Sequence, residues 1–365
     1  MKLSAPREAF LDPLQAVIGV VERRQTMPIL ANILIVARSG KVSFTATDLE
    51  VELVASGDIE ADKDGEITVP GRKLLDICRA LKDGSAVQLS VSGDRAKVTS
   101  GRSRFTLATL PASEFPTVEN INGQHDFTLP QSSMKRLFDK THFAMAHQDV
   151  RYYLNGLLLE NSGGQLRAVA TDGHRLALCD VEITTDEDGT QQVIVPRKGV
   201  LELQRLLKDD GDLVLSVGTN HIRAELDSIR FTSKLIDGRF PDYERVIPRK
   251  EGEYICAERS DFRQSLSRTA ILSNEKYRGI RLELGEDSVR IQAHNPEQEE
   301  AEEQIEVKYA GQEMEVGFNV NYLLDALGAL DGEEVSVQIS DPSSSCLIWD
   351  PSTEGCQYVV MPMRL

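Results

Sequence analysis

The sequence predicts an α+β protein of three similar domains, because its motifs recur at the spacing of a whole domain. The tetrapeptide Ala46–Leu49 returns as Ala170–Gly173, 124 residues later, and in degraded form as Ala293–Pro296. Val69–Lys73 likewise matches Val195–Gly199. A period near 124 residues is too long for a solenoid repeat and suits a compact domain. We therefore expect three domains, at residues 1–124, 125–250 and 251–365.

Each predicted domain contains two helices, which are recognised by apolar stripes. In the first domain Leu74, Ile77, Cys78 and Leu81 stand at i, i+3, i+4 and i+7, the spacing of one helical face. Equivalent stripes recur in the other two domains, and a second helical pattern opens each domain. We expect helices over residues 6–24, 69–83, 129–146, 195–209, 258–273 and 319–331.

Alternating residues after each helix predict antiparallel strands. The first segments to follow the opening helices are 32–36, 157–160 and 280–284, and those that follow the second helices are 87–99, 213–226 and 335–349. A further strand is expected at 105–110, 231–236 and 358–363. Each helix must bury its stripe on such strands, which gives two helix-plus-strands modules per domain, with the helices on one side of the sheets. Polar stretches at 120–126 and 248–253 are the expected linkers.

The composition is that of an ordinary globular protein, with 41% hydrophobic residues and a net charge of −17. The five cysteines include no CxxC pair, so we expect neither a disulfide framework nor a zinc site. No apolar run reaches the length of a membrane span, and residues 1–15 lack the apolar core of a signal peptide. The expectation is a reduced, cytoplasmic protein.

Basic residues are concentrated on the predicted helices, although the chain as a whole is acidic. The six helices carry 17 basic and 12 acidic residues. Basic residues recur at equivalent positions on the second helices of the first two domains. Arg72, Arg79 and Lys82 correspond to Lys198, Arg205 and Lys208. Such residues solvate an exposed face, or they form a weakly positive face that tolerates duplex DNA without reading its sequence. The sixth helix has no basic residue.

Catalysis is not predicted. Asp172 and His174 lie close together, but the six histidines show no HxH or HxxxH spacing, and no P-loop, GxGxxG or GxSxG is present. Asp48 and Asp172 occupy equivalent repeat positions, which is more typical of a turn or cap than of a catalyst. We expect no catalytic residue, metal or cofactor. An acidic scaffold that binds only proteins remains an alternative.

Several segments, in register with the repeats, resemble the bacterial β sliding clamp family, the processivity subunit of DNA polymerase III. They are Thr47–Glu50, Ser100–Phe105, Ala170–Ala177, Asp237–Tyr243, Ala270–Lys276 and Val360–Leu365. The resemblance covers the whole chain. It implies a head-to-tail homodimer whose two three-domain subunits close a six-domain ring, with the helices lining the hole. Duplex DNA would thread this ring, and no chemical step would be needed for processivity.

The resemblance also implies a contact between subunits. Its residues are Lys73, Arg102, Arg104, Phe105 and Leu107 in the first domain and Ile271, Leu272, Glu299, Glu300, Glu302 and Glu303 in the third. The basic and acidic clusters lie in different domains, as a head-to-tail contact requires. Each cluster taken alone is also typical of a solvated surface.

A client groove is the second implied site. Its residues are Leu154, Thr171, Gly173, His174, Arg175, Leu176, Pro241, Arg245, Val246, Asn319, Tyr322, Val359, Met361, Pro362, Met363, Arg364 and Leu365. The implied clients carry short motifs with a Gln and two hydrophobic residues: DNA polymerase III α, δ-type clamp-loader subunits, other polymerases, ligase and mismatch-repair proteins. From the residues alone, the tail is also compatible with a frayed terminus or a final strand.

DNA contact is the third implied site, at Arg24, Gln148, Tyr152 and Tyr153. The two tyrosines are also compatible with core residues that open a strand. Arg72, Arg79, Lys198 and Arg205 are further candidates from their helical positions. No membrane partner is expected, and a separate ATP-driven loader would open the ring.

Overall fold

The computed structural model describes residues 1–22, 27–118, 125–184 and 190–364. These residues form two compact units. The first comprises Met1–Ser132 and Lys198–Leu235, and the second Ser133–Arg197 and Ile236–Leu365. Each unit is described by itself below.

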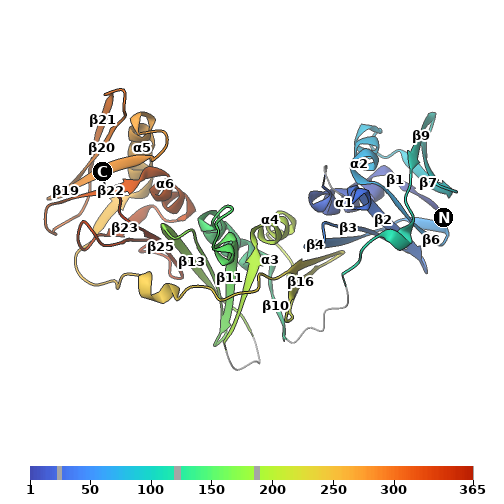
Figure 1. Ribbon diagram of the computed structural model, residues 1–365, viewed down its shortest axis with the longest axis horizontal. Helices are drawn as coiled ribbons and strands as arrows, with labels where there is room; N and C mark the ends of the chain where they lie inside the picture. Colours follow the sequence, from blue (N-terminus) through green and yellow to red (C-terminus); the bar gives the residue numbers. More distant parts are fainter. Residues whose placement is uncertain (23–26, 119–124, 185–189, 365) are drawn as a thin grey trace. The chain divides into compact units, whose positions relative to one another are not determined.

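All six expected helices are present. They are α1 (Arg7–Val17), α2 (Gly71–Ala80), α3 (Gln131–Thr141), α4 (Arg197–Leu206), α5 (Arg259–Thr269) and α6 (Val320–Ala329) (Figure 1). Each is shorter than expected. Pro6 and Pro70 stand directly before α1 and α2, where the missing N–H groups cost nothing. The opening helices α1, α3 and α5 each pass into a short 3-10 turn, η1 (Ile18–Val20), η4 (His142–Ala144) and η7 (Ala270–Leu272).

The first unit contains two antiparallel sheets. The smaller has the order β5 (Glu60–Lys63), β1 (Lys2–Pro6), β7 (Ala86–Ser92), β8 (Arg95–Ser100) and β9 (Ser103–Ala108). The larger has the order β10 (His125–Pro130), β15 (Asp212–Val217), β16 (His221–Leu226), β17 (Ile229–Lys234), β4 (Val51–Gly57), β3 (Lys41–Thr47), β2 (Asn32–Arg38) and β6 (Gly65–Pro70).

The second unit repeats this plan. Its larger sheet has the order β14 (Gln191–Pro196), β11 (Gly156–Ser162), β12 (Gln165–Thr171), β13 (Arg175–Glu182), β25 (Cys356–Val360), β24 (Cys346–Trp349), β23 (Glu334–Gln338) and β18 (Ile255–Glu258). Its smaller sheet has the order β21 (Glu300–Glu306), β20 (Ser288–His294), β19 (Gly279–Gly285) and β22 (Met314–Asn319).

The cores form where helix stripes meet one face of a sheet. Helix α1 packs on β3 and β4, and Phe10 meets Phe44 edge to face with ring centroids 6.3 Å apart. Helix α5 packs in the same way on β20 and β21. Strand β19 alternates buried and partly exposed residues along its length, as a strand covered on one face does. The expected helix-plus-strands modules are therefore confirmed.

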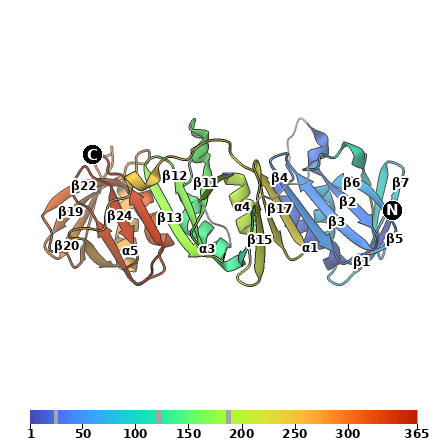
Figure 2. The same cartoon turned by 90° about the horizontal axis from the view of Figure 1, so that it is seen from below.

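Each eight-stranded sheet crosses a boundary between repeats. In the first unit β17 pairs antiparallel with β4, with Phe231 opposite Leu53 (Figure 2). In the second unit β13 pairs with β25 in the same way, with Ala177 opposite Tyr358. In each pairing, the third strand of the opening module of one repeat meets the third strand of the second module of the next repeat. Backbone pairing at these two boundaries removes sheet edges that would otherwise be exposed.

Basic side chains close the carboxyl ends of helices. Arg7 donates from Nε to the Cys78 carbonyl at 2.9 Å, and Arg259, at the equivalent place in the third repeat, donates to Leu327 and Gly332. Cations satisfy the last carbonyls of a helix and suit its negative end. Part of the helical basic charge therefore serves packing between the two modules of a repeat.

The expectation of no disulfide is wrong for one pair. Cys179 and Cys356 are joined by a disulfide, while Cys78, Cys256 and Cys346 are free thiols. The two bonded residues are 177 positions apart and meet only because β13 pairs with β25. Nothing in their sequence spacing indicates this contact.

Two further observations concern the described residues only. None of their helices is long and apolar enough to cross a membrane. No cluster of three or more His, Cys, Asp or Glu residues among them is arranged to hold a metal ion.

Candidate functional site

The turn between β12 and β13 is built by Thr171 and Asp172. The Asp172 carboxylate accepts from the N–H groups of His174 and Arg175 at 2.9 and 3.0 Å, and Thr171 donates to the Arg175 carbonyl at 2.6 Å. Thr47 and Asp48 make the same contacts in the first repeat. These residues therefore form turns, as repetition predicts, and the turn after Thr171 carries residues predicted for the client groove.

Gly173 adopts a left-handed backbone conformation in this turn. Its φ is +87°, and an added Cβ would lie 3.0 Å from Nη2 of Arg151. The equivalent residue in the first repeat, Leu49, also has a positive φ of 78°. The left-handed conformation is therefore tolerated by a residue with a side chain in the first repeat. At position 173, the nearby guanidinium of Arg151 is what makes a side chain unfavourable.

The chain's last described residues are anchored beside this turn. Val359 and Val360 pair with Leu176 and Arg175, and the Met361 N–H donates to the His174 carbonyl at 2.9 Å. The Met363 N–H then donates to the Gly317 carbonyl on β22 at 2.7 Å. The alternative of a frayed terminus does not hold for residues 356–363. Leu365 lies outside the described residues.

Arg175 connects three parts of the second unit. Its guanidinium donates to Asp172, to Asp325 on α6 and to the Phe143 carbonyl, the last at 2.6 Å. Its Cζ atom also lies 4.5 Å from the ring centroid of Tyr322. The planar guanidinium group carries several N–H donors, so it can bind several acceptors at once. The predicted wall residues Thr171, Arg175 and Tyr322 are thereby brought together.

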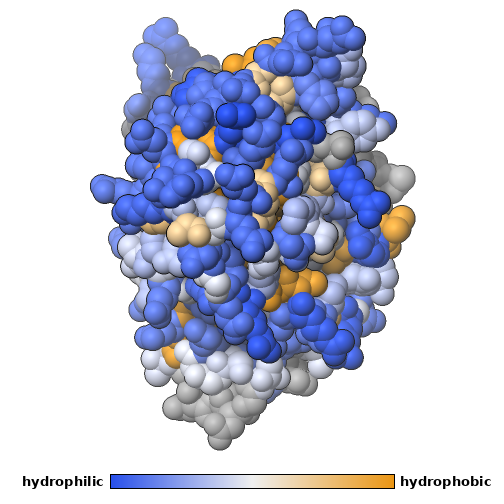
Figure 3. Space-filling model, turned by 90° about the vertical axis from the view of Figure 1, so that its left-hand side faces the viewer, coloured by the Kyte–Doolittle hydropathy of each residue, from blue (hydrophilic) through white to orange (hydrophobic). Residues whose placement is uncertain are grey.

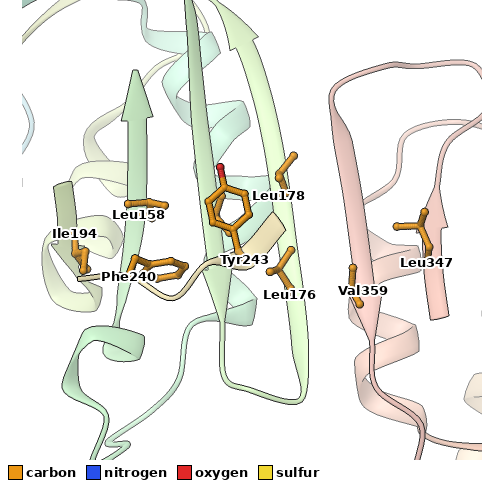
Figure 4. Close-up of a cluster of buried hydrophobic side chains, with 9 residues drawn as sticks. Leu158, Leu176, Leu178, Ile194, Phe240, Tyr243, Leu347 and Val359 are labelled. Carbon is orange, nitrogen blue, oxygen red and sulfur yellow. The ribbon is translucent and has the colours of Figure 1, made fainter. Parts of the chain in front are cut away.

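An apolar cluster that includes the predicted groove residues Leu176 and Val359 packs on the larger sheet. Phe240 and Tyr243 come from the segment after β17 and lie near Leu158 and Leu176, while Val359 belongs to the same cluster from β25 (Figure 4). Further members are Val169, Leu178, Ile194 and Leu347. The cluster spans both halves of the sheet, so it fixes the segment that carries Pro241, Arg245 and Val246.

A polar network holds the same segment at its outer side. Tyr243 donates to Glu160 at 2.9 Å and accepts from Arg167 at 3.2 Å, while Arg167 makes a two-point contact with Asp180. Burial, together with the contact to Glu160, raises the pKa of Tyr243 to about 12. The hydroxyl therefore stays protonated and remains a donor at neutral pH.

A hollow of about 570 Å³ lies beside this segment, lined in part by Arg245, Val246 and Ile247. Gln338 and Ser345 belong to its other side. Val246 and Met361 expose 39% and 38% of their surfaces.

The predicted groove residues differ in their exposure. Leu154, Leu176 and Val359 are buried. His174, Pro241, Arg245, Met361 and Arg364 are exposed, while Thr171, Gly173, Arg175, Asn319, Tyr322, Pro362 and Met363 are half-buried. Sequence reasoning missed Phe143, Asp325 and Tyr277, whose carbonyl accepts from Asn319. No motif marks these three residues.

Three of the four predicted DNA residues, Gln148, Tyr152 and Tyr153, lie near a turn that precedes β11. Gln148 is exposed with a φ of +58°, and Tyr152 exposes 58% of its surface. Tyr153 packs against the apolar cluster, so the core alternative is correct in part for this residue. The Asp149 carboxylate accepts from the guanidinium and from the backbone N–H of Arg151, which lowers the pKa of Asp149 to about 2. Arg24 lies outside the described residues.

Three of the four further helical candidates already have partners in the first unit. Arg72 donates to the Val21 carbonyl at 2.8 Å, Lys198 pairs with Glu22 and Asp48, and Arg205 donates to the Ala16 carbonyl at 2.6 Å. The expectation that they form an open cationic face needs correction, since these contacts join α2 and α4 to the end of α1 and to the turn before β4. Arg79 is exposed on α2.

The predicted subunit-contact residues lie on and beside two edge strands. Arg102 and Arg104 are exposed at the start of β9, where Phe105 is half-buried and Leu107 is buried, and Lys73 is exposed on α2. Glu299, Glu300 and Glu302 are exposed at β21, while Glu303 pairs with Arg268 at 2.7 Å. Leu272 is half-buried, but Ile271 exposes 75% of its surface. The face drawn in Figure 3 is mostly hydrophilic with small separate apolar patches.

Models of the N-terminal, central and C-terminal domains of the DNA polymerase III beta subunit match residues 1–119, 128–242 and 244–364. The chain belongs to the DNA polymerase III beta subunit family. Its function is that of a sliding clamp for DNA polymerase III.

Similar proteins agree over the full length. The beta sliding clamps of Pseudomonas aeruginosa and Escherichia coli K12 are 54% and 51% identical to this chain, with all of each chain covered. The crystal structure of the P. aeruginosa beta subunit matches with a TM-score of 0.97 and 54% identity over 100% of both chains. That of Caulobacter crescentus matches with a TM-score of 0.95 and 41% identity, also over 100% of both chains. The three-domain clamp fold is thus confirmed.

Proposed function

We propose that two copies of this chain close head to tail around duplex DNA by pairing β9 of one copy with β21 of the other. The two observed sheet junctions carry this proposal, because β4 pairs with β17 and β13 with β25 through equivalent third strands. In the described chain, β21 and β9 are the remaining third strands, and each stands at the edge of its sheet. An open edge is a template for another strand.

The repeats also set the register of this proposed pairing. Ala46 pairs with Leu53 on β4, and Leu53 lies opposite Phe231 on β17. Ala170 pairs with Ala177 on β13, and Ala177 lies opposite Tyr358 on β25. Ala293 occupies the equivalent position in the third repeat. Ala301, the partner of Ala293, is therefore assigned the same position. Phe105 stands two residues after its hairpin turn, as Phe231 does. By this equivalence Ala301 lies opposite Phe105 of the second copy.

Charge and apolar side chains agree with that register. Antiparallel pairing through Ala301 and Phe105 places Glu302 opposite Arg104, an attractive cross-strand pair. Phe105 then falls on the face of β21 that contacts η7, whose Ile271 is largely exposed. A contact with an apolar centre and an oppositely charged rim is typical of a specific interface.

We also propose that the groove of the second unit binds short client motifs. The exposed Met361 and Val246 offer apolar contacts, and Arg175 and the turn at Gly173 hold a rigid polar wall. Flexible methionines adapt to varied partners. Relatives from P. aeruginosa and Bartonella birtlesii were solved bound to griselimycin, which supports a ligand-binding surface in the family. The proposed clients are polymerases, clamp-loader subunits, ligase and mismatch-repair proteins of the cytoplasm.

In this proposal the protein acts without catalysis. A client bound to a ring on DNA is held near its template at an effective concentration on the order of millimolar. The ring is held by topology, with Gln148, Tyr152, Tyr153 and Arg24 as the proposed DNA contacts, so high affinity for phosphate is unnecessary.

Retention on circular DNA tests this function. After loading by a clamp loader and ATP, the protein should stay on nicked circles and dissociate when one restriction cut makes them linear. Equal loss from both templates would support a protein-binding scaffold and overturn the ring. Nucleotide hydrolysis by the purified chain alone would contradict the proposed absence of catalysis.

A further inference from the structure

The Cys179–Cys356 disulfide lies at the boundary between the second and third repeats. The two residues stand directly opposite each other at one end of the β13–β25 pairing, with Cα atoms 4.1 Å apart. This pairing is where the two halves of the larger sheet in the second unit meet. The bond therefore links strands that otherwise associate only through backbone hydrogen bonds and packing.

The opposite end of the same pairing forms the client groove. There Arg175 faces Val360, and the Met361 N–H donates to the His174 carbonyl. Arg175 also binds Asp325, so this end is held by side chains. Asp180 N–H donates to the Gly355 carbonyl beside the cysteines at 2.8 Å. The disulfide is the covalent restraint at this end of the pairing.

The surroundings of the two sulfurs are unequal. Arg136 on α3 lies with Nη2 3.7 Å from the Cys356 Sγ atom and also pairs with Asp331. Cys356 retains 8% of its surface exposed, and Cys179 retains none. A guanidinium favours the thiolate over the thiol, and the thiolate is the form that exchanges with disulfides. Cys356 is thus the sulfur suited to react first.

We propose that Cys179 and Cys356 form a reversible redox site that locks the β13–β25 junction when oxidised. The oxidant is a low-molecular-weight disulfide. The Cys356 thiolate attacks one of its sulfurs and expels one thiolate, and the Cys179 thiolate then attacks the Cys356 sulfur and expels the second. The protein loses two protons and two electrons, and the oxidant becomes two thiols. Disulfides in reducing compartments are mostly of this transient, redox-sensing kind.

Oxidation should act on junction stability and leave groove shape unchanged, since the groove end of the pairing is held independently. The closed loop spans 177 residues, so the bond restricts the unfolded chain strongly. We expect the oxidised protein to melt about 5 to 10 °C above the reduced protein. Amide exchange at Leu178 and Gln357 should slow by at least about tenfold on oxidation.

The test equilibrates the full-length protein in mixtures of oxidised and reduced glutathione, traps thiols by alkylation and maps peptides by mass spectrometry. A Cys179–Cys356 peptide pair that appears and disappears with the mixture supports the proposal. The melting difference should vanish in Cys356→Ser and in Cys179→Ala, and it should persist in Cys256→Ser, the matched control. If Cys356→Ser or Cys179→Ala fails to fold, the other variant still tests the proposal.

Three results would overturn the inference. Both thiols could remain fully alkylated across all mixtures, or another cysteine could be found in the cross-linked peptide. The reduced and oxidised proteins could also melt at the same temperature although the cross-link forms.

Discussion

Arg175 holds three parts of the second unit at one point, through Asp172, Asp325 and the Phe143 carbonyl. Repetition predicts Asp172 because Asp48 makes the same turn. No repeat predicts Asp325, since α6 reaches Arg175 only in the folded sheet assembly of the second unit. At the scale of one residue, local hydrogen bonds are therefore readable from the sequence, and long-range ones are not.

Replacing Arg175 by lysine should weaken client binding. Lysine keeps the charge, but it cannot contact both carboxylates and the carbonyl at once. We expect loss of about 1–2 kcal/mol of unfolding free energy, and about tenfold weaker binding of a peptide with one Gln and two hydrophobic residues. Fluorescence anisotropy of the labelled peptide measures the affinity.

The control for this change is Arg38→Lys on β2, an exposed arginine in the other unit. It should leave both stability and peptide affinity unchanged. Unaltered peptide binding by Arg175→Lys would show that clients do not use this wall.

At the scale of elements, the junction of α3 with α6 depends on charge. Lys140 donates to the Ala329 carbonyl at the end of α6 and pairs with Asp331, as Arg136 also does at 3.1 Å. Burial by itself would raise the pKa of Asp331, but contacts with Lys140 and Arg136 outweigh burial and hold the pKa below its ordinary value. The ionised carboxylate therefore stabilises the junction.

Asp331→Asn should lower stability in a pH-dependent way. Because the folded-state pKa is depressed, the contribution is present above the unfolded value of about 4 and is lost as pH falls through the folded value. Solvent screens this partly exposed pair, so we expect a cost of about 0.5–1 kcal/mol at pH 7. Thermal melts of both proteins from pH 7 down to pH 3 measure the difference.

The gap between the two melting temperatures should close at the acid end of that series. Asp58→Asn, on an exposed loop residue, is the matched control and should show no gap at any pH. A gap that is constant with pH would mean that the Asp331 charge is not what stabilises the junction.

The proposed strand register can be tested by exchanging charges. Glu302→Arg alone and Arg104→Glu alone should each weaken the dimer by about tenfold, because each creates a like-charged cross-strand pair. The double variant restores opposite charges at both contacts and should dissociate within about threefold of the unchanged protein. Analytical ultracentrifugation across protein concentrations measures dissociation.

Glu286→Arg, in an exposed turn, serves as control for the change in net charge. If the double variant dissociates as readily as the single ones, Glu302 and Arg104 do not face each other and the register is wrong.

At the scale of the whole molecule, assembly depends on the apolar centre of the proposed contact. Ile271→Ala with Leu272→Ala should convert dimer to monomer at nanomolar concentration while each unit keeps its fold, because Ile271 is mostly exposed in the single chain. Truncating a central apolar residue typically costs about 1 kcal/mol or more of binding. Mass photometry measures the mass, and circular dichroism checks the fold.

Unchanged mass for this double variant would show that the contact lies elsewhere. Retention on nicked circles should fall with dimer stability, so the same variant links the oligomeric state to function.

The sequence by itself determined the features that depend on neighbours in the chain. The 124-residue repeat, the six helices and the turns at Asp48 and Asp172 all follow from local periodicity and short-range hydrogen bonds. The tertiary structure alone decided the disulfide between Cys179 and Cys356 and the distant partners of Arg175, Lys198 and Arg205. Strand pairing across repeats places these residues together, and no local pattern encodes which distant strand will be the partner.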